Sequence, residues 1–280
     1  MKENKARVIA FYLPQYHPIP ENDKYWGKGF TEWTNVAKAK PLFRGHYQPH
    51  IPADLGFYDL RLPEVREAQA ELARDAGIEG FCYYHYWFGN GKMLLQKPFE
   101  EVLRLGKPDF PFCLCWANHD WTTKTWVKGS SMVNNTMIAQ QEYLGEQDDI
   151  KHFEYCLRAF KDHRYITIEG KPIFLIYDPL SFPNVKEFMN RWNFLAKKNN
   201  LKGIYFIGVT TGRQSSYKIV TNLGFDGVCH NRRWEAEAKA AGFRFVRRMQ
   251  SLLGWHLGIS LMKYDYLSLI HISEPTRLQL

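Results

Sequence analysis

The feature that most constrains this chain is a repeated pattern in which a short apolar run ends in aromatic and polar side chains. The clearest runs and their endings are Val8–Tyr12 before residues 13–17, Gly80–Tyr84 before residues 85–88, and Phe112–Cys115 before residues 116–121. A parallel strand that is buried on both faces is apolar along its length. Because the carboxyl ends of parallel strands meet at one edge, the sequence predicts a functional rim at that edge of a sheet.

Helical patterns alternate with the apolar runs. We expect strands over residues 8–12, 80–84, 112–116, 172–177, 204–209 and 227–230. We expect helices over residues 63–76, 97–105, 148–161, 185–198 and 216–223. In the first helix, Pro63 suits the first turn and Gly77 suits the end. The alternation favours a parallel α/β sheet with right-handed crossovers.

Periodicity alone fits a doubly wound sheet as well as a barrel. Doubly wound nucleotide-binding folds place a glycine-rich phosphate turn after their first strand, and residues 13–20 contain no glycine. The aromatic and polar clusters also follow several strands, whereas a doubly wound sheet gathers its site at one switch point. We therefore expect the α/β class and a (β/α)8 TIM-type barrel that is incomplete, because about six of its eight strands are recognisable.

The composition bounds the domain count and the class of ligand. The chain has 280 residues, of which 45% are hydrophobic and 16% aromatic, and this length suits one barrel. Sugar rings present apolar C–H faces that stack on Trp and Tyr, so an aromatic and polar rim suits a glycan. Aromatic packing beneath long loops would explain the same composition.

The net charge of +8 does not predict a nucleic-acid partner. Lys and Arg mostly alternate with acids, as in residues 64–67 and 71–75, which is typical of solvated helix faces. The most basic stretch, residues 232–248, has no groove-reading motif beside it and is interpreted as another such face. Binding of that stretch to phosphates or anionic lipid head groups is the alternative.

The cysteines and the hydropathy indicate a protein of a reducing compartment. The five cysteines include no C-x-x-C pair, which suits small buried side chains better than disulfides. No apolar run approaches the length of a membrane span or forms a signal peptide, so we expect a cytoplasmic protein. His46 and His50 are four apart in a loop and not on a helix, so we predict no metal and no cofactor.

Four segments of the sequence resemble a known family. They are residues 11–23 (FYLPQYHPIPEND), 26–36 (WGKGFTEWTNV), 80–88 (GFCYYHYWF) and 115–118 (CWAN). They resemble the WbsX-type glycosyltransferases of polysaccharide and lipopolysaccharide biosynthesis, which are related to glycoside hydrolase family 99. The resemblance implies a (β/α)8 barrel that acts on mannose-type or related cell-surface polysaccharide glycans, with an oligosaccharide or polysaccharide as its partner.

The resemblance leaves the chemistry open. Glycosidases place two carboxyl groups about the scissile bond, and the hydrolase relatives supply them as a Glu-x-x-Glu pair near the end of the barrel. This chain has that spacing only at Glu64 and Glu67, where both read as solvated, while Glu142 and Glu146 miss it by one residue. A transferase would need a diphosphate site that the sequence does not show. Retaining hydrolase-like chemistry is therefore favoured over a glycosyltransferase or a non-catalytic carbohydrate-binding barrel.

The candidates for glycan binding lie at or beyond the expected strand ends. They are Tyr12, Gln15, His17, Glu32, Trp33, Tyr84, His85, Trp87, Trp116, Asn118, Asp120 and Tyr177. Those that end strands of the same direction should line one concave face, namely Tyr12, His85, Trp116, Asn118 and Tyr177. The alternatives are a hydrogen-bonded core histidine for His85 and a turn cap or ion pair for Glu32. The usual family pattern after Trp-Ala-Asn is Glu-Asn-Trp, and residues 119–121 depart from it, so the resemblance does not fix the sugar or linkage.

The end of the chain does not resemble the family. The likeness continues to residue 266, and residues 267–280 look like translated sequencing-adapter read-through, the alternative being a divergent last strand. We therefore expect one partial barrel domain over residues 1–266 and a non-native tail over residues 267–280. Such a chain would lack the paired glutamates, so we expect it to be inactive, with the catalytic pair in the intact parent protein.

Overall fold

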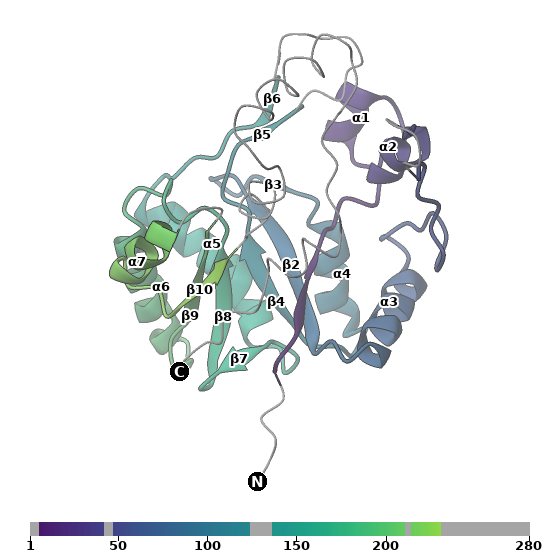
Figure 1. Cartoon of the computed structure of the whole chain (residues 1–280). Helices are drawn as coiled ribbons and strands as arrows, with labels where there is room; N and C mark the ends of the chain where they lie inside the picture. Colours follow the sequence, from purple (N-terminus) through teal and green to yellow (C-terminus); the bar gives the residue numbers. More distant parts are fainter. Residues whose placement is uncertain (1–5, 42–46, 124–135, 211–213, 231–280) are drawn as a thin grey trace.

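Figure 1 shows the computed structural model of the chain, which describes residues 6–41, 47–123, 136–210 and 214–230. Three features predicted from the sequence lie outside the described residues. They are His46, the basic stretch 232–248 and the tail 267–280. Within the described ranges, none of the helices combines the length and the apolar character that a membrane crossing needs.

A curled parallel sheet forms the centre of the described chain. Its strands lie in the order β1 (Ile9–Tyr12), β2 (Gly80–Trp87), β4 (Phe112–Trp116), β8 (Lys171–Ile176), β9 (Tyr205–Thr210) and β10 (Gly227–His230). The short antiparallel strands are β3 (Met93–Leu94) beside β2, β7 (Thr167–Ile168) beside β8, and the pair β5 (Trp121–Thr122) and β6 (Met137–Ala139). The prediction of six strands in a parallel α/β sheet is confirmed.

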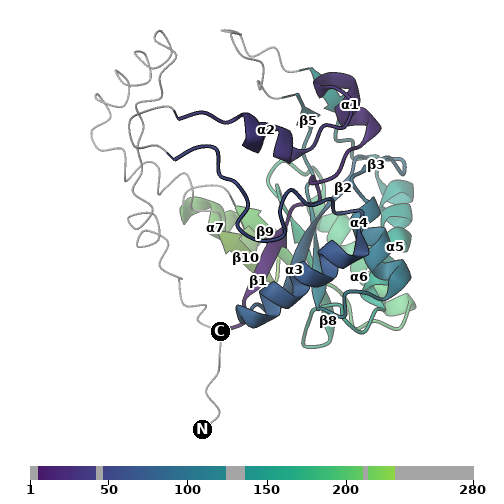
Figure 2. The ribbon, with the colours of Figure 1, turned by 90° about the vertical axis from the view of Figure 1, so that its right-hand side faces the viewer.

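The helices lie on one side of the sheet or beyond its carboxyl ends. They are α1 (Pro20–Trp26), α2 (Glu32–Lys38), α3 (Pro63–Asp75), α4 (Lys97–Leu105), α5 (Glu146–Phe160), α6 (Val185–Lys198) and α7 (Gln214–Asn222). Figure 2 shows α3, α4, α5 and α6 together on one side of the sheet. In Figure 1, α1, α2 and the β5–β6 pair lie above the carboxyl ends of the strands.

The connection from β1 to α3, which we call the first long loop, contains helices α1 and α2, and the sequence analysis predicted neither of them. Each helix has seven residues, which is too short for an apolar face to repeat in the sequence. Local signals begin them instead. Pro20 occupies the first turn of α1, and the Thr31 hydroxyl accepts a hydrogen bond from the Trp33 backbone at the start of α2.

Strand pairing divides the side chains of the sheet between two faces. In the parallel register Tyr12 lies beside Tyr83, and His85 lies beside Trp116. Because neighbouring residues of a strand point to opposite faces, these side chains share the face that meets the helices, which we call the helix face. The opposite face, which carries side chains such as Tyr84, is called the inner face.

Aromatic side chains pack closely between the helix face and α6. Phe174 of β8 lies 4.7 Å from the ring of Trp192 of α6, and Trp192 lies 4.6 Å from Phe188. All three side chains are almost fully buried. Burial of one such side chain stabilises the fold by roughly 1.5–3 kcal/mol, so this layer fixes α6 on the sheet.

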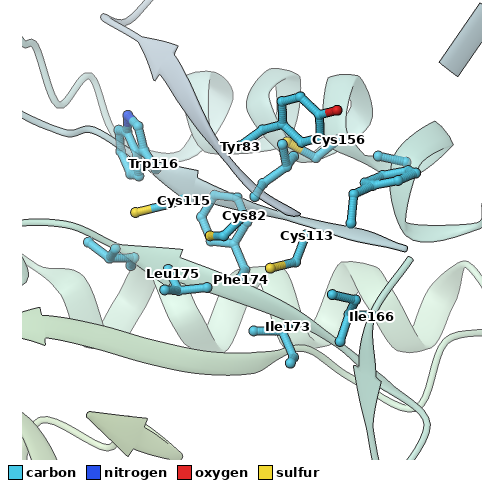
Figure 3. Close-up of a cluster of buried hydrophobic side chains, with 14 of the residues drawn as sticks. Cys82, Tyr83, Cys113, Cys115, Trp116, Cys156, Ile166, Ile173, Phe174 and Leu175 are labelled. Atoms are coloured by element: carbon cyan, nitrogen blue, oxygen red, sulfur yellow. The ribbon is translucent and has the colours of Figure 1, made fainter. Parts of the chain in front are cut away.

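Thiols fill part of the inner face. Cys82 of β2 hydrogen-bonds to Cys113 and Cys115 of β4, and all three side chains are buried (Figure 3). Burial raises the pKa of the Cys82 thiol well above its usual value. These cysteines therefore act as small apolar side chains, as the sequence predicted.

We predict that Gly80→Ala destabilises the fold. A methyl group on Gly80 would collide with the carbonyl oxygen of Pro111, which is held in place because it accepts a hydrogen bond from the Phe81 backbone. We expect urea titration to show a loss of about 1–3 kcal/mol. Gly227→Ala is the matched control, because its methyl group would meet Ile207 Cγ1 at an ordinary 3.5 Å. Equal losses in the two variants would contradict the steric explanation.

Candidate functional site

A row of aromatic rings crosses the inner face at the carboxyl ends of the strands. The Phe11 ring stacks on Tyr84 at 5.4 Å, Tyr84 meets Tyr177 edge-on at 5.9 Å, and Tyr177 lies 5.4 Å from the ring of His119. Phe11 is exposed, and the other three side chains are half-buried. We call these four side chains the aromatic row. It presents ring surface and polar edges together, as a sugar-binding surface does.

A second line of contacts lies beside the aromatic row. The Gln15 amide donates a hydrogen bond of 3.1 Å to the Tyr86 hydroxyl, and the Tyr86 ring stacks on Trp121 at 5.7 Å. Gln15 follows β1, Tyr86 belongs to β2, and Trp121 begins β5. The carboxyl ends of two sheet strands and the β5–β6 pair thus supply one amide, one phenol and one indole.

Glu32 supplies a carboxyl group near this line. It begins α2 and is half-buried. Burial raises the pKa of Glu32, and a hydrogen bond with Asn35 opposes the shift. Burial also raises the pKa of the Tyr86 hydroxyl, and the charge of Glu32 adds to that rise, so the two groups lie within electrostatic range. A carboxyl group in this position can exchange hydrogen bonds with ligand hydroxyls.

Trp33 and Asp120, two further candidates, are engaged in organising loops. The Trp33 indole donates a hydrogen bond of 2.8 Å to the Tyr58 carbonyl, and its ring lies 4.6 Å from the Tyr16 ring in a tilted arrangement. The exposed Asp120 accepts a hydrogen bond of 2.7 Å from the Gln141 backbone. Trp33 therefore anchors the first long loop, and Asp120 joins the loop after β4 to the segment after β6.

The prediction that one concave face collects Tyr12, His85 and Trp116 together with Tyr177 is wrong. Tyr12 donates a hydrogen bond of 2.6 Å to Gln69 of α3. The ring of His85 stacks on Tyr155 of α5 at 5.5 Å, and Trp116 lies 5.5 Å from Phe188 of α6. These three candidates lie on the helix face, because each directly follows an inner-face residue of its own strand and side chains alternate between the two faces.

Two other candidates form internal hydrogen bonds at the strand ends. The Trp87 indole donates to Asp148 at 3.1 Å, and its carbonyl accepts from the Trp116 indole at 2.9 Å. The Asn118 amide donates to the Asp178 carbonyl at 2.8 Å and accepts from the Asp178 backbone at 2.7 Å. Asn118 is 1% exposed, so it joins the loops after β4 and β8 and does not face a ligand.

His17, the remaining candidate, lies in a separate pocket. It is 1% exposed and lines a space of ≈ 360 Å³ with Arg61, Lys97 and neighbouring residues. Burial lowers the pKa of His17, and the charges of Arg61 and Lys97 lower it further, while Asp59 and a hydrogen bond to Pro14 raise it. His17 is therefore a buried neutral imidazole near the loop after β1.

The structure also brings together a group that the sequence analysis missed. The Nε2 atoms of His85 and His152 are 2.8 Å apart, and Cys156 completes a set of donor atoms that all lie within 4.8 Å of one another. Burial lowers the pKa of His85 to about 3 and that of His152 well below its usual value, so both rings are neutral. The sequence contained one signal for this group, namely the spacing of His152 and Cys156, which places them one helical turn apart on α5.

The sequence profile described as Glycosyltransferase WbsX matches residues 8–274. The chain belongs to the WbsX glycosyltransferase family. Two uncharacterized proteins named WxcX, from Xanthomonas campestris pv. campestris strains B100 and ATCC 33913, are each 42% identical to this WbsX chain over 223 residues. The match covers 80% of the chain and 31% of each relative, so the chain spans about a third of their length.

A solved structure supports the fold of this WbsX chain. The GH99 endo-α-mannosidase of Bacteroides thetaiotaomicron, in complex with bis-tris propane, aligns with a TM-score of 0.51 at 17% identity. The alignment covers 90% of this chain and 66% of the mannosidase. Likeness at this identity concerns the fold alone, and it confirms the predicted α/β barrel class.

We predict that Trp116→Ala acts on stability. Trp116 is 3% exposed and its indole nitrogen is hydrogen-bonded to Trp87, so truncation leaves a cavity and an unpaired carbonyl. Chemical denaturation should show a loss of about 3–5 kcal/mol. Phe194→Ala is the control, because Phe194 is 67% exposed and its removal should change stability by less than about 0.5 kcal/mol. Wild-type stability in Trp116→Ala would contradict the helix-face position.

We predict that acid destabilises the chain partly through His17. Its pKa is lowered from 6.5 in the folded state, so the unfolded state takes up a proton first as the pH falls. The contribution of neutral His17 is therefore complete above the unfolded pKa and is lost below it, by up to about 1.4 kcal/mol per pH unit until the folded pKa is reached.

Free energies of unfolding at about pH 7.5 and about pH 5.5 measure this effect. The loss on acidification should be smaller in His17→Asn than in the wild type. His163→Asn should keep the wild-type loss, because the His163 side chain is 83% exposed. An unchanged loss in His17→Asn would show that His17 does not couple folding to pH.

Proposed function

We propose that this chain forms the glycan-binding sheet and rim of a carbohydrate-active enzyme that acts on glycosidic bonds of mannose-type or related cell-surface polysaccharide glycans. The observation that carries the proposal is the aromatic row, with Gln15 and Glu32 beside it. A pyranose ring needs a flat apolar partner for its C–H face and planar polar partners for its hydroxyls. The inner face offers both at the strand ends, where barrel enzymes bind their substrates.

The polar groups of the proposed rim indicate which kind of ligand it would bind. Gln15 offers both a donor and an acceptor, and the Glu32 carboxylate accepts hydrogen bonds from hydroxyl groups. The Tyr84 hydroxyl is protonated at neutral pH, as a phenol usually is, and burial raises its pKa further. Together these groups suit a neutral polyol better than a charged ligand.

Retaining hydrolase-like chemistry is our first choice for the intact enzyme. It requires two carboxyl groups on opposite sides of the scissile bond. Glu64 and Glu67, which have the family spacing, belong to α3 on the outer side of the sheet and do not meet this requirement. The rim described here is therefore proposed to bind and orient the glycan, and the cleaving pair is proposed to come from other residues of the intact enzyme.

Glycosyl transfer is the second candidate, and the family description favours it. In hydrolysis the glycan is the glycosyl donor and water is the acceptor, whereas in transfer the glycan is the acceptor and an activated sugar, usually bound through a diphosphate, is the donor. Calorimetric titration with a nucleoside diphosphate separates them. Saturable binding would favour transfer, and its absence beside glycan binding would favour hydrolysis.

We predict that Tyr177→Ala weakens glycan binding. The probe is an α-linked mannose oligosaccharide titrated into residues 1–280 by calorimetry, with a β-linked glucose oligosaccharide for comparison. Loss of one stacking ring should reduce affinity by about 0.5–1.5 kcal/mol, which is about 2- to 12-fold. Thermal stability should change little, because Tyr177 is half-buried at the rim.

Phe194→Ala is the matched control, since it removes an exposed aromatic ring from α6 on the other side of the sheet. It should bind as the wild type does. A wild-type chain that binds neither oligosaccharide, or an equal loss in the two variants, would overturn the assignment of the aromatic row as a glycan platform.

A further inference from the structure

Three donor side chains meet between the sheet and α5, away from the aromatic row. His85 lies on the helix face of β2, and His152 and Cys156 lie one turn apart on the facing side of α5. Their donor atoms lie within 4.8 Å of one another, and all three side chains are buried. Residues 67 positions apart in sequence are thus held together by a strand and a helix that both pack into the core.

Aromatic rings enclose this group. The Trp87 ring stacks on His152 at 4.6 Å with an interplanar angle of 3°. Trp116 and Trp192 meet His152 edge-on at 4.8 Å and 5.0 Å, and Tyr155 stacks on His85. Two acids contact the enclosing rings and are hydrogen-bonded to them, because Asp148 accepts from the Trp87 indole and Glu100 accepts from the Tyr155 hydroxyl.

We propose that His85, His152 and Cys156 form a binding site for a single monovalent copper ion. A soft thiolate favours Cu(I), imidazole also binds copper, and three donors suffice for trigonal coordination of this ion. The complex of Cu⁺ with one thiolate and two neutral imidazoles carries no net charge, so its burial among aromatic rings is not opposed. Zn²⁺ would leave one positive charge and would lack a fourth ligand.

The donor positions need only a small adjustment. Two nitrogens that each lie about 2.0 Å from one ion at a trigonal angle are about 3.5 Å apart. The observed separation of the two Nε2 atoms is 2.8 Å, a hydrogen bond that the ion would replace. On binding, the Cys156 thiol releases its proton to solvent, and the imidazole that carried its proton on Nε2 moves it to Nδ1. No electron is transferred, so the copper stays Cu(I).

The proposed ion would act as a structural link. It would join the carboxyl end of β2, which carries Tyr84 and Tyr86 on the opposite face, to α5. Metal binding to a site that exists only in the folded state adds its free energy to folding. This role is independent of the glycan proposal, because the two sites use opposite faces of β2.

The test is anaerobic competition with the Cu(I) chelator bicinchoninate, using residues 1–280. The wild type is expected to withdraw one Cu(I) per chain and to melt at a higher temperature with copper than without it. Cys156→Ser should weaken copper binding by about tenfold or more, since even loss of an outer-shell partner costs that much. Cys113→Ser is the matched control, because it removes a thiol that is equally buried on the inner face.

X-ray absorption of the wild-type copper complex tests the ligands without any variant. One sulfur and two nitrogen scatterers are expected. Two or three sulfur scatterers, or a copper affinity that falls in Cys113→Ser and not in Cys156→Ser, would place the ion among the inner-face thiols and overturn the proposal. A wild-type chain that withdraws no copper, or that binds Zn²⁺ in preference, would overturn it as well.

Discussion

The pairing of β2 with β4 is the constraint on which the rest of the structure depends. The two strands are in register from Phe81 beside Phe112 to His85 beside Trp116. Because side chains alternate along a strand, this register decides which aromatic residues enter the helix layer and which reach the inner face. A shift of the register by one residue would turn Tyr84 toward the helices. Its neighbour His85, which now packs against α5, would then lie on the inner face. The same strand therefore supplies both core and candidate site.

Buried hydrogen bonds then fix the strand ends. The Trp116 indole donates to the Trp87 carbonyl, the Trp87 indole donates to Asp148, and Asn118 exchanges two bonds with Asp178. Each bond contributes only about 1 kcal/mol net, but an unpaired partner in this environment would cost about 1–3 kcal/mol. These hydrogen bonds therefore add little to the total stability, but they strongly disfavour any other arrangement of the strand ends. Rings of the inner face can keep fixed spacings because the backbone beneath them is held on its other side.

The strands and the main helices were predictable because burial and helix periodicity leave local signals. The face of each side chain was not. A strand buried on both sides shows no polar alternation, so His85 and Tyr84 look equally suited to a rim, and only the contact with α5 separates them. The contact between His85 and His152 spans 67 residues and follows from packing alone. Helices α1 and α2 were missed because one or two turns leave no periodic pattern.

The first long loop and the sheet position different groups of the candidate site. Trp33 packs against Tyr16 and hydrogen-bonds to the Tyr58 carbonyl, and the Leu60 backbone donates to the Tyr16 carbonyl. The two ends of the loop are thus joined through a small aromatic core of their own. Glu32 precedes Trp33 on α2, so its carboxyl group is positioned by this loop core, whereas the rings beneath it are positioned by the sheet. Changes within the loop can therefore alter hydroxyl recognition without disturbing the stacking surface.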